Sequence, residues 1–249
     1  MIRAIRIELS KMRRLNSLPL LGVLVVAVSV LSSITVFTST PETRRDPAAL
    51  PWAGLLLTYT LMAAMTSPIL VAVLASRHTD IEHTGSGWIL AGCAGYTPGL
   101  LCRAKLVATG IVLLPAILAQ SLLVIGIGRL AGISVPLEAG AWARYTALLF
   151  GLNLGFLALH IWLAAILENQ LISVGLGTLG AFLAAFSLLV PGTVSRFIPW
   201  GYYAMISQVG TPGGTLAYVS PPYAWIAGFL ALVAACFAVA TRRLDRREG

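Results

Sequence analysis

The chain contains two lysines, Lys11 and Lys105, and neither lies in a phosphate-binding loop. A P-loop has the form G-x-x-x-x-G-K-S/T, because its backbone amides hold the phosphates while the lysine reaches toward them. Ser10 and Ala104 stand where that motif requires a glycine, so neither lysine completes it. Nucleotide chemistry of this kind must therefore belong to a partner protein.

The histidines and cysteines form no catalytic or metal-binding pattern. His78 and His83 lack the H-E-x-x-H spacing of zinc proteases, and His160 stands alone in an apolar run, where a packed or hydrogen-bonded role is expected. No C-x-x-C spacing occurs, so we expect small buried hydrophobes at Cys93, Cys102 and Cys236. We predict no catalytic residue, metal or cofactor, and the chain is not expected to be an enzyme.

A short polar segment, residues 76–87, is richer in charge than its surroundings. Its ionisable residues are Arg77, His78, Asp80, Glu82 and His83. Two interpretations remain open at this point. The segment is either a solvated loop or a docking element for a cytoplasmic partner, because charged rims are common on any protein surface.

The composition places these residues in a membrane protein. Of 249 residues, 58% are hydrophobic and 10% are charged, whereas a soluble domain averages about 25% charged residues. Hydrocarbon offers no water to the backbone, so spanning segments must be helices or closed barrels. Runs such as residues 18–37 stay apolar for the roughly 20 residues that a spanning helix needs. The sequence predicts an all-α polytopic membrane protein.

Six spanning helices are expected from the apolar runs. They are predicted at residues 18–38, 51–75, 106–126, 142–167, 171–190 and 223–240, with a kink at Pro68 in the second. Residues 88–102 are apolar but broken by glycine and proline, which favours an interfacial or re-entrant piece. The stretch 191–222 is rich in proline, glycine and aromatic residues. All of it belongs to one predicted transmembrane domain, residues 1–249.

An amphipathic helix is predicted before the first span. Ile2, Ile5, Leu9 and Met12 recur at helical spacing among basic residues, which suits a helix that rests in the lipid headgroup region. A signal peptide also begins with basic residues. The apolar run that follows is long for a signal peptide and lacks a convincing cleavage site, so we expect an uncleaved first span.

The formal charge of +8 reflects the orientation in the membrane. Basic residues flank the spans and form no basic face, so we expect contact with membrane lipid and no nucleic-acid partner. With both termini in the cytoplasm, 12 of the 17 Lys and Arg residues lie on the cytoplasmic side. This excess predicts an even number of spans in a cell membrane.

Several segments, taken in order, resemble the permease subunits of ABC exporters, especially the lantibiotic-immunity and bacitracin-resistance kind. They are R-I-E-L-S-K-M-R-R-L, D-I-E-H-T-G-S-G-W-I-L-A-G, G-Y-T-P-G-L-L-C-R-A-K, L-E-N-Q-L-I and F-I-P-W-G-Y. The resemblance covers nearly the whole chain through short motifs. It implies a permease that pairs with a second copy or a paralogue and docks on two ABC ATPase subunits.

The same resemblance implies roles for particular residues. The segment with Asp80, Glu82, His83 and Trp88 resembles the element that couples such permeases to the ATPase, and Glu168 falls in a second cytoplasmic contact. Peptides or other amphipathic compounds are the implied cargo. Export of such compounds implies a role in resistance to antimicrobial peptides.

A protein that works without an ATPase is the competing class. A secondary transporter usually places ionisable groups at mid-membrane. The predicted spans contain no acidic residue there, and the fourth contains only His160, which disfavours ion coupling. A binding-type immunity protein remains open as a second alternative.

Overall fold

The structure is a computed structural model that describes residues 1–247. The last two residues of the predicted domain, 248–249, lie outside the described part. The helices are α1 Ile2–Arg14, α2 Ser17–Thr38, α3 Pro41–Arg45, α4 Pro51–Thr84, α5 Gly87–Cys93, α6 Pro98–Leu130, α7 Ala139–Ile166, α8 Gln170–Phe186, α9 Gly192–Ser195, α10 Tyr202–Met205 and α11 Tyr223–Arg247.

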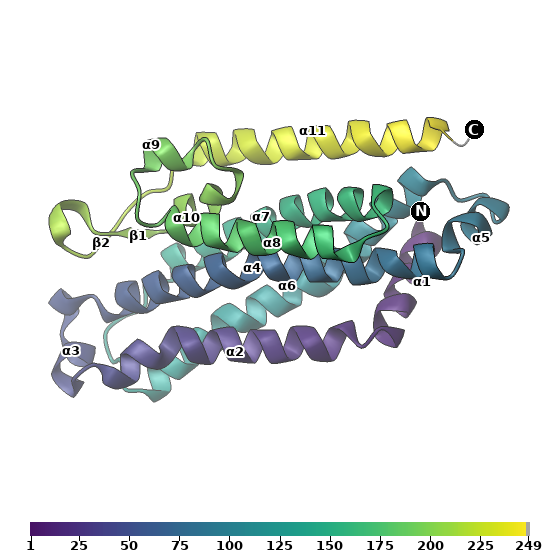
Figure 1. Cartoon of the computed structure of the whole chain (residues 1–249). Coiled ribbons are helices and arrows are strands. Elements are labelled where there is room, and N and C mark those ends of the chain that lie inside the picture. The colour runs from purple at the N-terminus through teal and green to yellow at the C-terminus, as the bar shows by residue number, and fades with distance from the viewer. Residues whose placement is uncertain (248–249) are drawn as a thin grey trace.

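The long helices lie side by side and alternate in direction along the chain where short connections join them (Figure 1). Helices α1 and α5 and the end of α11 lie at one end of the bundle, which we call the α5 end. Helix α3 and the hairpin of β1 (Val209–Gly210) and β2 (Ala217–Tyr218) lie at the other, the α3 end. Both ends of the described chain are therefore on the same side of the bundle.

Within residues 1–247, five helices are long and apolar enough to cross a membrane, namely α2, α4, α6, α7 and α11. The predicted fifth span, residues 171–190, is shorter than expected. It forms α8, which ends at Phe186 and has 17 residues, or about 26 Å of helix against a hydrocarbon core of about 30 Å. An all-α polytopic membrane protein is confirmed, whereas the sixth span stays a prediction.

The polar segment 76–87 is not the loop that hydropathy indicates, because α4 continues to Thr84. No glycine or proline interrupts residues 76–84, and Lys105 Nζ donates to the His78 carbonyl oxygen in this part of the helix. The apolar piece 88–102 is also divided. Its first half is α5, and its second half is the start of α6, where Thr97 caps the helix and Pro98 occupies the first turn.

Helix α1 forms at the predicted place, but it buries a different face. Ala4, Glu8 and Met12 are buried against α6 and α2, whereas Ile2 is exposed. A carboxylate therefore occupies the middle of the packed face. Whether α1 rests in the headgroup region remains a prediction.

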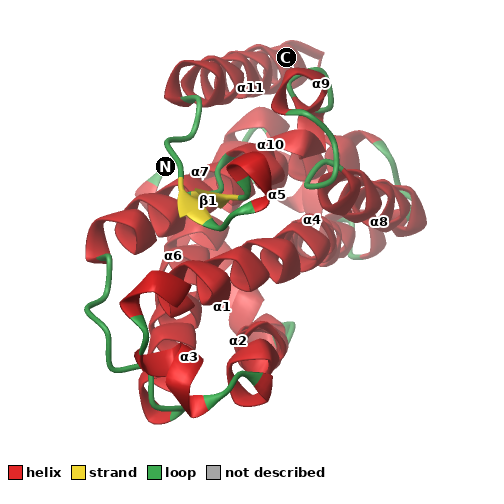
Figure 2. Ribbon diagram, turned by 90° about the vertical axis from the view of Figure 1, so that its left-hand side faces the viewer, coloured by secondary structure: helices red, strands yellow, loops and turns green. Residues whose placement is uncertain are grey.

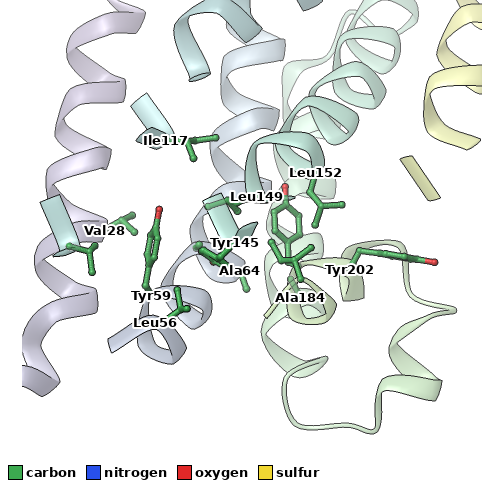
Figure 3. Packing of buried hydrophobic residues seen from close by; sticks show 14 of the residues in the cluster. Val28, Leu56, Tyr59, Ala64, Ile117, Tyr145, Leu149, Leu152, Ala184 and Tyr202 are labelled. Atoms are coloured by element: carbon green, nitrogen blue, oxygen red, sulfur yellow. The ribbon is translucent and has the colours of Figure 1, made fainter. Parts of the chain in front are cut away.

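Aromatic side chains fill the centre of the bundle, where α4 packs against α2, α7 and α8. Tyr59 stacks on Trp142 and meets Tyr145 edge-on, and Figure 3 shows Tyr59 and Tyr145 among the buried residues. The Tyr59 hydroxyl lies 3.1 Å from Ser121 Oγ. A hydrogen bond of this kind offsets the free-energy cost of burying the hydroxyl group of a tyrosine.

A glycine lets α8 approach α4 closely. A Cβ atom at Gly177 would lie 2.5 Å from the Ala72 Cβ and 2.8 Å from the Pro68 carbonyl oxygen, which is closer than real contacts allow. Pro68 is internal to α4, as expected. Helix α11, in contrast, packs mainly along α6 and α7 and lies on the outside of the bundle (Figure 2).

The stretch 191–222 closes the α3 end between α8 and α11. It contains α9, α10, the β1–β2 hairpin and the short 3-10 turns Pro199–Gly201 and Pro212–Gly214. A further 3-10 turn, Pro47–Ala49, precedes α4. The Trp200 ring stacks on Phe156, which fastens this stretch to α7.

Candidate functional site: a buried ion cluster and an adjoining acidic cleft

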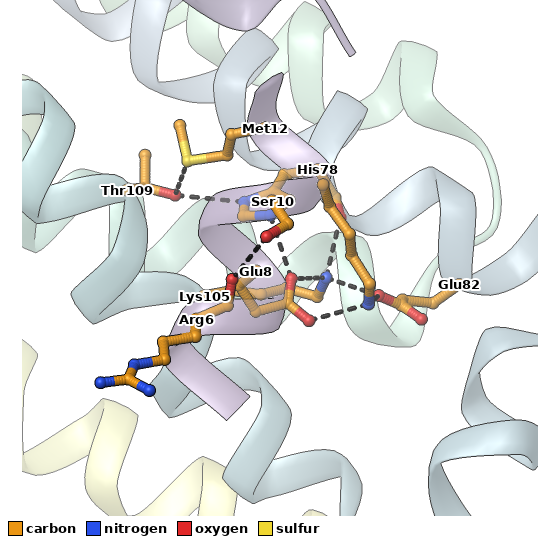
Figure 4. Close-up of polar contacts among 9 residues, drawn as sticks. Arg6, Glu8, Ser10, Met12, His78, Glu82, Lys105 and Thr109 are labelled. Atoms are coloured by element: carbon orange, nitrogen blue, oxygen red, sulfur yellow. Dashed lines mark hydrogen bonds and ion pairs between the residues drawn. The ribbon is translucent and has the colours of Figure 1, made fainter. Parts of the chain in front are cut away.

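Both lysines of the chain meet at the α5 end of the bundle in a buried ion cluster. Its members, from α1, α4 and α6, are Glu8, Lys11, His78, Glu82 and Lys105 (Figure 4). Lys105 is fully buried, and its Nζ donates to Glu8 Oε2 at 2.7 Å, to Glu82 Oε1 at 2.7 Å and to the His78 carbonyl oxygen at 2.8 Å. An ammonium group has three protons, so every one has an acceptor.

Further contacts come from Lys11 and His78. Lys11 Nζ donates to Glu8 Oε1 at 2.8 Å and to Glu82 Oε1 at 2.5 Å. His78 Nε2 lies 3.0 Å from Glu8 Oε2, and its Nδ1 lies 3.2 Å from Thr109 Oγ1. A neutral imidazole with its proton on Nε2 points that proton toward the side of the Glu8 carboxylate and leaves Nδ1 to accept the hydroxyl proton of Thr109.

Charge balance stabilises this arrangement. Two carboxylates face two ammonium groups, so the cluster is neutral when His78 is neutral. Burial alone would raise the pKa of Glu8, but the approach of His78, Lys105 and Lys11 outweighs it and lowers that pKa from 4.5 to about 2. Burial would lower the pKa of Lys11, but the bonds to Glu8 and Glu82 raise it. Both groups are therefore held in their charged forms.

Gly87 lets the chain turn beside this cluster. A Cβ atom there would lie 2.1 Å from Glu82 Oε2, so any larger residue would displace the carboxylate. Ser86, at the start of α5, has a positive φ of 52°. The turn from α4 into α5 is thus shaped around Glu82. A groove of about 300 Å³ follows between α1 and α5, and its walls include Glu8, Lys11 and Glu82.

Sequence reasoning missed Glu8, Lys11, His78 and Lys105 as a group. The sequence presents Lys11 and Lys105 as lysines outside a P-loop and as basic residues beside apolar segments, and Glu8 as part of a basic segment. Lys105, at the start of a long apolar run, is the one signal in the sequence, because an ionisable group that is buried in a helix bundle usually pairs with an opposite charge. Glu8 is the one acidic residue among residues 1–14.

The predicted coupling residues fall into two groups. Asp80, His83 and Glu168 line one small cleft between the end of α4 and the α7–α8 turn. His83 Nε2 lies 2.9 Å from the Ala164 carbonyl oxygen, which joins the two walls. Glu82 faces the other way, into the ion cluster, and is 3% exposed. Its Oε1 accepts hydrogen bonds from Lys11 and Lys105, and its coupling role stays a prediction.

Trp88 connects the cleft to α5. Its ring meets His83 edge-on at 5.8 Å between centroids. The next two residues, Ile89 and Leu90, are 70% and 66% exposed. Helix α5 therefore presents an apolar face beside the acidic cleft, at the same end of the bundle.

This surface is suited to binding. In the described part of the chain, no three His, Cys, Asp or Glu side chains form a group that could hold a metal ion. The lysines, which are the nucleophiles that burial can activate, here hold carboxylates as charged ammonium groups. The arrangement can fasten helices together and present charge and apolar surface to another protein.

Comparison with known proteins identifies the family. The model of the family described as ABC-2 family transporter protein matches residues 4–184, which include the ion cluster and the acidic cleft. No curated protein matches the chain. The match covers well over half of the 249 residues, and the apolar helices agree with a multi-pass membrane protein. The chain therefore belongs to the ABC-2 family of transporter proteins, as a membrane-embedded permease subunit.

Proposed function

We propose that the chain is the membrane-spanning subunit of an ATP-driven exporter that works with separate ABC ATPase subunits. It acts with a second permease copy or a paralogue in the cell membrane, with six spans and both termini in the cytoplasm. Peptides or amphipathic compounds are the proposed cargo, so the protein would contribute to resistance against antimicrobial peptides. In general, ABC-2 family permeases imply an ABC ATPase partner.

The proposal rests on the acidic cleft, which Asp80, His83 and Glu168 line. Asp80 and His83 come from α4, and Glu168 comes from the distant α7–α8 turn, yet they line the same cleft. Glu168 is exposed and Asp80 is partly exposed, so both carboxylates can reach a basic surface. Complementary charge of this kind sets the register and the rate of association between proteins.

Helix α5 provides the apolar part of the proposed docking surface. Ile89 and Leu90 project from it, and Trp88 joins it to His83 of the cleft. A protein interface combines an apolar centre with a polar rim. We therefore assign the docking role to Asp80, His83, Trp88 and Glu168, and we assign Glu82 to the ion cluster behind them.

The ion cluster supports a mechanical role for this surface. Force applied to α5 reaches Glu82 through the close turn at Gly87. Lys11 connects Glu82 to α1, and Lys105 connects it to α6. A push from an ATPase would thus move three helix ends together, since paired buried charges resist separation. We propose that this is how ATP hydrolysis is transmitted to the spans.

An ion-coupled transporter is less well supported by the position of the cluster. Glu82 lies two residues before the end of α4, and Lys105 lies within the first turns of α6. Coupling ions in secondary transporters bind near the middle of the membrane. The cluster lies at the helix ends, where an ATPase subunit would make contact.

The docking surface can be tested by removing its charge without disturbing the cluster. Asp80→Asn with Glu168→Gln should lower the amount of ATPase that co-purifies with the chain by at least about threefold, because complementary rim charges mainly speed association. Glu42→Gln with Glu138→Gln is the matched control, since both residues are exposed near the α3 end. Equal recovery of the ATPase with both double variants would reject this docking surface.

A further inference from the structure

A continuous groove follows one face of α11. Three adjoining hollows, of about 490, 330 and 500 Å³, lie along this helix. The first two share Phe229 and Leu232, and the last two share Cys236 and Ala240. They therefore form one groove, which we call the α11 groove.

The spacing of the lining residues agrees with a single helix face. Trp225, Phe229, Leu232, Cys236, Ala240 and Arg243 follow one another at intervals of three or four residues, which is the repeat of one side of an α-helix. Residues 225 to 243 span about 27 Å at 1.5 Å per residue, close to the hydrocarbon thickness of about 30 Å. The groove thus extends along nearly a whole membrane thickness.

The opposite wall is apolar and belongs largely to α7. Phe156, Leu159 and Trp162 face the middle of the groove. Gly151 and Gly155, which form a G-x-x-x-G pattern in α7, contact Leu230 of α11. This pattern therefore serves contact with α11 within the chain. The groove itself stays open to the side, because Leu232 and Val239 are 61% and 49% exposed.

Arg196 closes the groove at the α3 end. Its guanidinium lies 4.9 Å from the centroid of the Trp225 ring, and it lines the first hollow. The Nε atom is buried and has no hydrogen-bond partner among residues 1–247. No acidic side chain lines this hollow. A cation that faces an apolar groove without a counter-ion is suited to an anionic ligand.

We propose that the α11 groove binds an anionic phospholipid, with its phosphate at Arg196 and an acyl chain along α11 as far as Cys236. A guanidinium pairs with phosphate through parallel hydrogen bonds, and the aromatic walls suit a hydrocarbon chain. Residues 225 to 236 span about 16 Å of helix, which is about half of a 30 Å hydrocarbon core. A lipid from the leaflet at the α3 end therefore fits in length and charge.

A second copy of the chain is the other occupant to consider. It would cover the apolar walls, but it would leave the buried Nε of Arg196 without an anion unless it also supplied a carboxylate. Lipid binding goes beyond the proposed function and needs no ATPase. Its failure would therefore leave the proposed transport role untouched, and the loss of ATPase docking would leave the lipid site intact.

The native cysteines allow a direct test. Cys102 is buried as expected, but the expectation of burial is wrong for Cys236, which is exposed in the groove, and for Cys93, which is exposed on α5. The purified chain in detergent is mixed with phosphatidylglycerol or phosphatidylcholine, and reaction of each thiol with a maleimide is followed by mass spectrometry. Phosphatidylglycerol should slow the reaction at Cys236 in a saturable way and leave Cys93 unchanged. Phosphatidylcholine should protect Cys236 less.

Two variants test separately the charge of Arg196 and the open space beside Gly228. Arg196→Gln should raise the phosphatidylglycerol concentration for half-protection by roughly tenfold, as loss of a charge-assisted hydrogen bond does, whereas Arg45→Gln should not. Gly228 lines the first hollow and has open space around it, so Gly228→Leu should also abolish protection. Gly126→Leu is the control, at another open glycine, on α6.

Three results would overturn the proposal. The first is protection that is equal for the two lipids and unchanged by Arg196→Gln. The second is protection that survives Gly228→Leu. The third is a Cys236 thiol that is already protected without lipid and forms a disulfide between two chains, which would assign the groove to a second copy.

Discussion

Lys105 is the residue on which the organisation of the α5 end depends most. It is fully buried, and its ammonium group holds carboxylates from α1 and α4. A buried charge whose partner is removed costs about 3–5 kcal/mol, whereas removal of both partners costs far less. Lysine also differs from arginine here, because a compact ammonium fits three acceptors around one atom and a planar guanidinium does not.

The first prediction concerns the coupling of Glu8 and Lys105. Glu8→Gln and Lys105→Met should each destabilise the purified protein by about 3 kcal/mol, because each leaves a buried charge without its partner. The double variant keeps the neutral Lys11–Glu82 pair, so its loss should be clearly smaller than the sum. Thermal unfolding in detergent measures all three. Strictly additive losses would mean that the two residues act separately.

The pH dependence follows from the lowered pKa of Glu8. This pKa is about 2 in the folded protein and 4.5 for the ordinary group, so the carboxylate contributes stability above pH 4.5 and loses it as the pH falls toward 2. The difference corresponds to about 3 kcal/mol. Unfolding in detergent between pH 7 and pH 2.5 should therefore show an acid-dependent loss that Glu8→Gln lacks. An identical acid profile for both proteins would contradict this role.

The helices show what the sequence could and could not predict. Apolar runs located all the long helices, because hydrocarbon thickness sets their length. The same reasoning ended the second span at residue 75, whereas α4 continues to Thr84. Hydropathy marks where a helix leaves an apolar environment. The last turns of α4 are polar and are held by Lys105 and Lys11, which come from distant segments. Such partners cannot be found by reading one segment at a time.

Local signals also competed at two further boundaries. Thr97 and Pro98 form a good start for a helix, and this signal was outweighed by the general apolar character of residues 88–102. Apolar residues continue to residue 190, which predicts a longer fifth span. In the structure, α8 ends at Phe186 and the apolar residues after it lie outside the helix. For the candidate site, the sequence predicts the charged segment 76–87. It does not predict that Asp80 and Glu82 point in different directions, because this depends on the segment being helical.

Contact between α4 and α8 gives a prediction at the scale of elements. Gly177→Leu should force these helices apart and destabilise the protein by about 1–3 kcal/mol, as overpacking does. Gly175→Leu is the matched control on the same helix, because a Cβ atom at Gly175 meets nothing within 4 Å. Thermal unfolding in detergent compares the two. Equal stability of both variants would mean that the helices do not pack as described.

The whole molecule combines a bundle of apolar helices with one charged end. The ion cluster, the acidic cleft and α5 all lie at the α5 end, near the first residue and the end of α11. The positive-inside bias supports the proposal that this end faces the cytoplasm. The α11 groove lies on the outside of the bundle and extends toward the α3 end. The proposed docking surface and the proposed lipid groove are thus separate parts of one permease.

The central claim is that this permease depends on a separate ATPase subunit. The most direct measurement is purification of the full chain from its native membrane in mild detergent, followed by assay of ATP hydrolysis before and after the chain is stripped of bound proteins. We expect a subunit with a P-loop to co-purify and to account for all of the hydrolysis, because neither Lys11 nor Lys105 lies in such a loop. Hydrolysis by the stripped chain, or transport by the chain with no ATPase bound, would contradict the account.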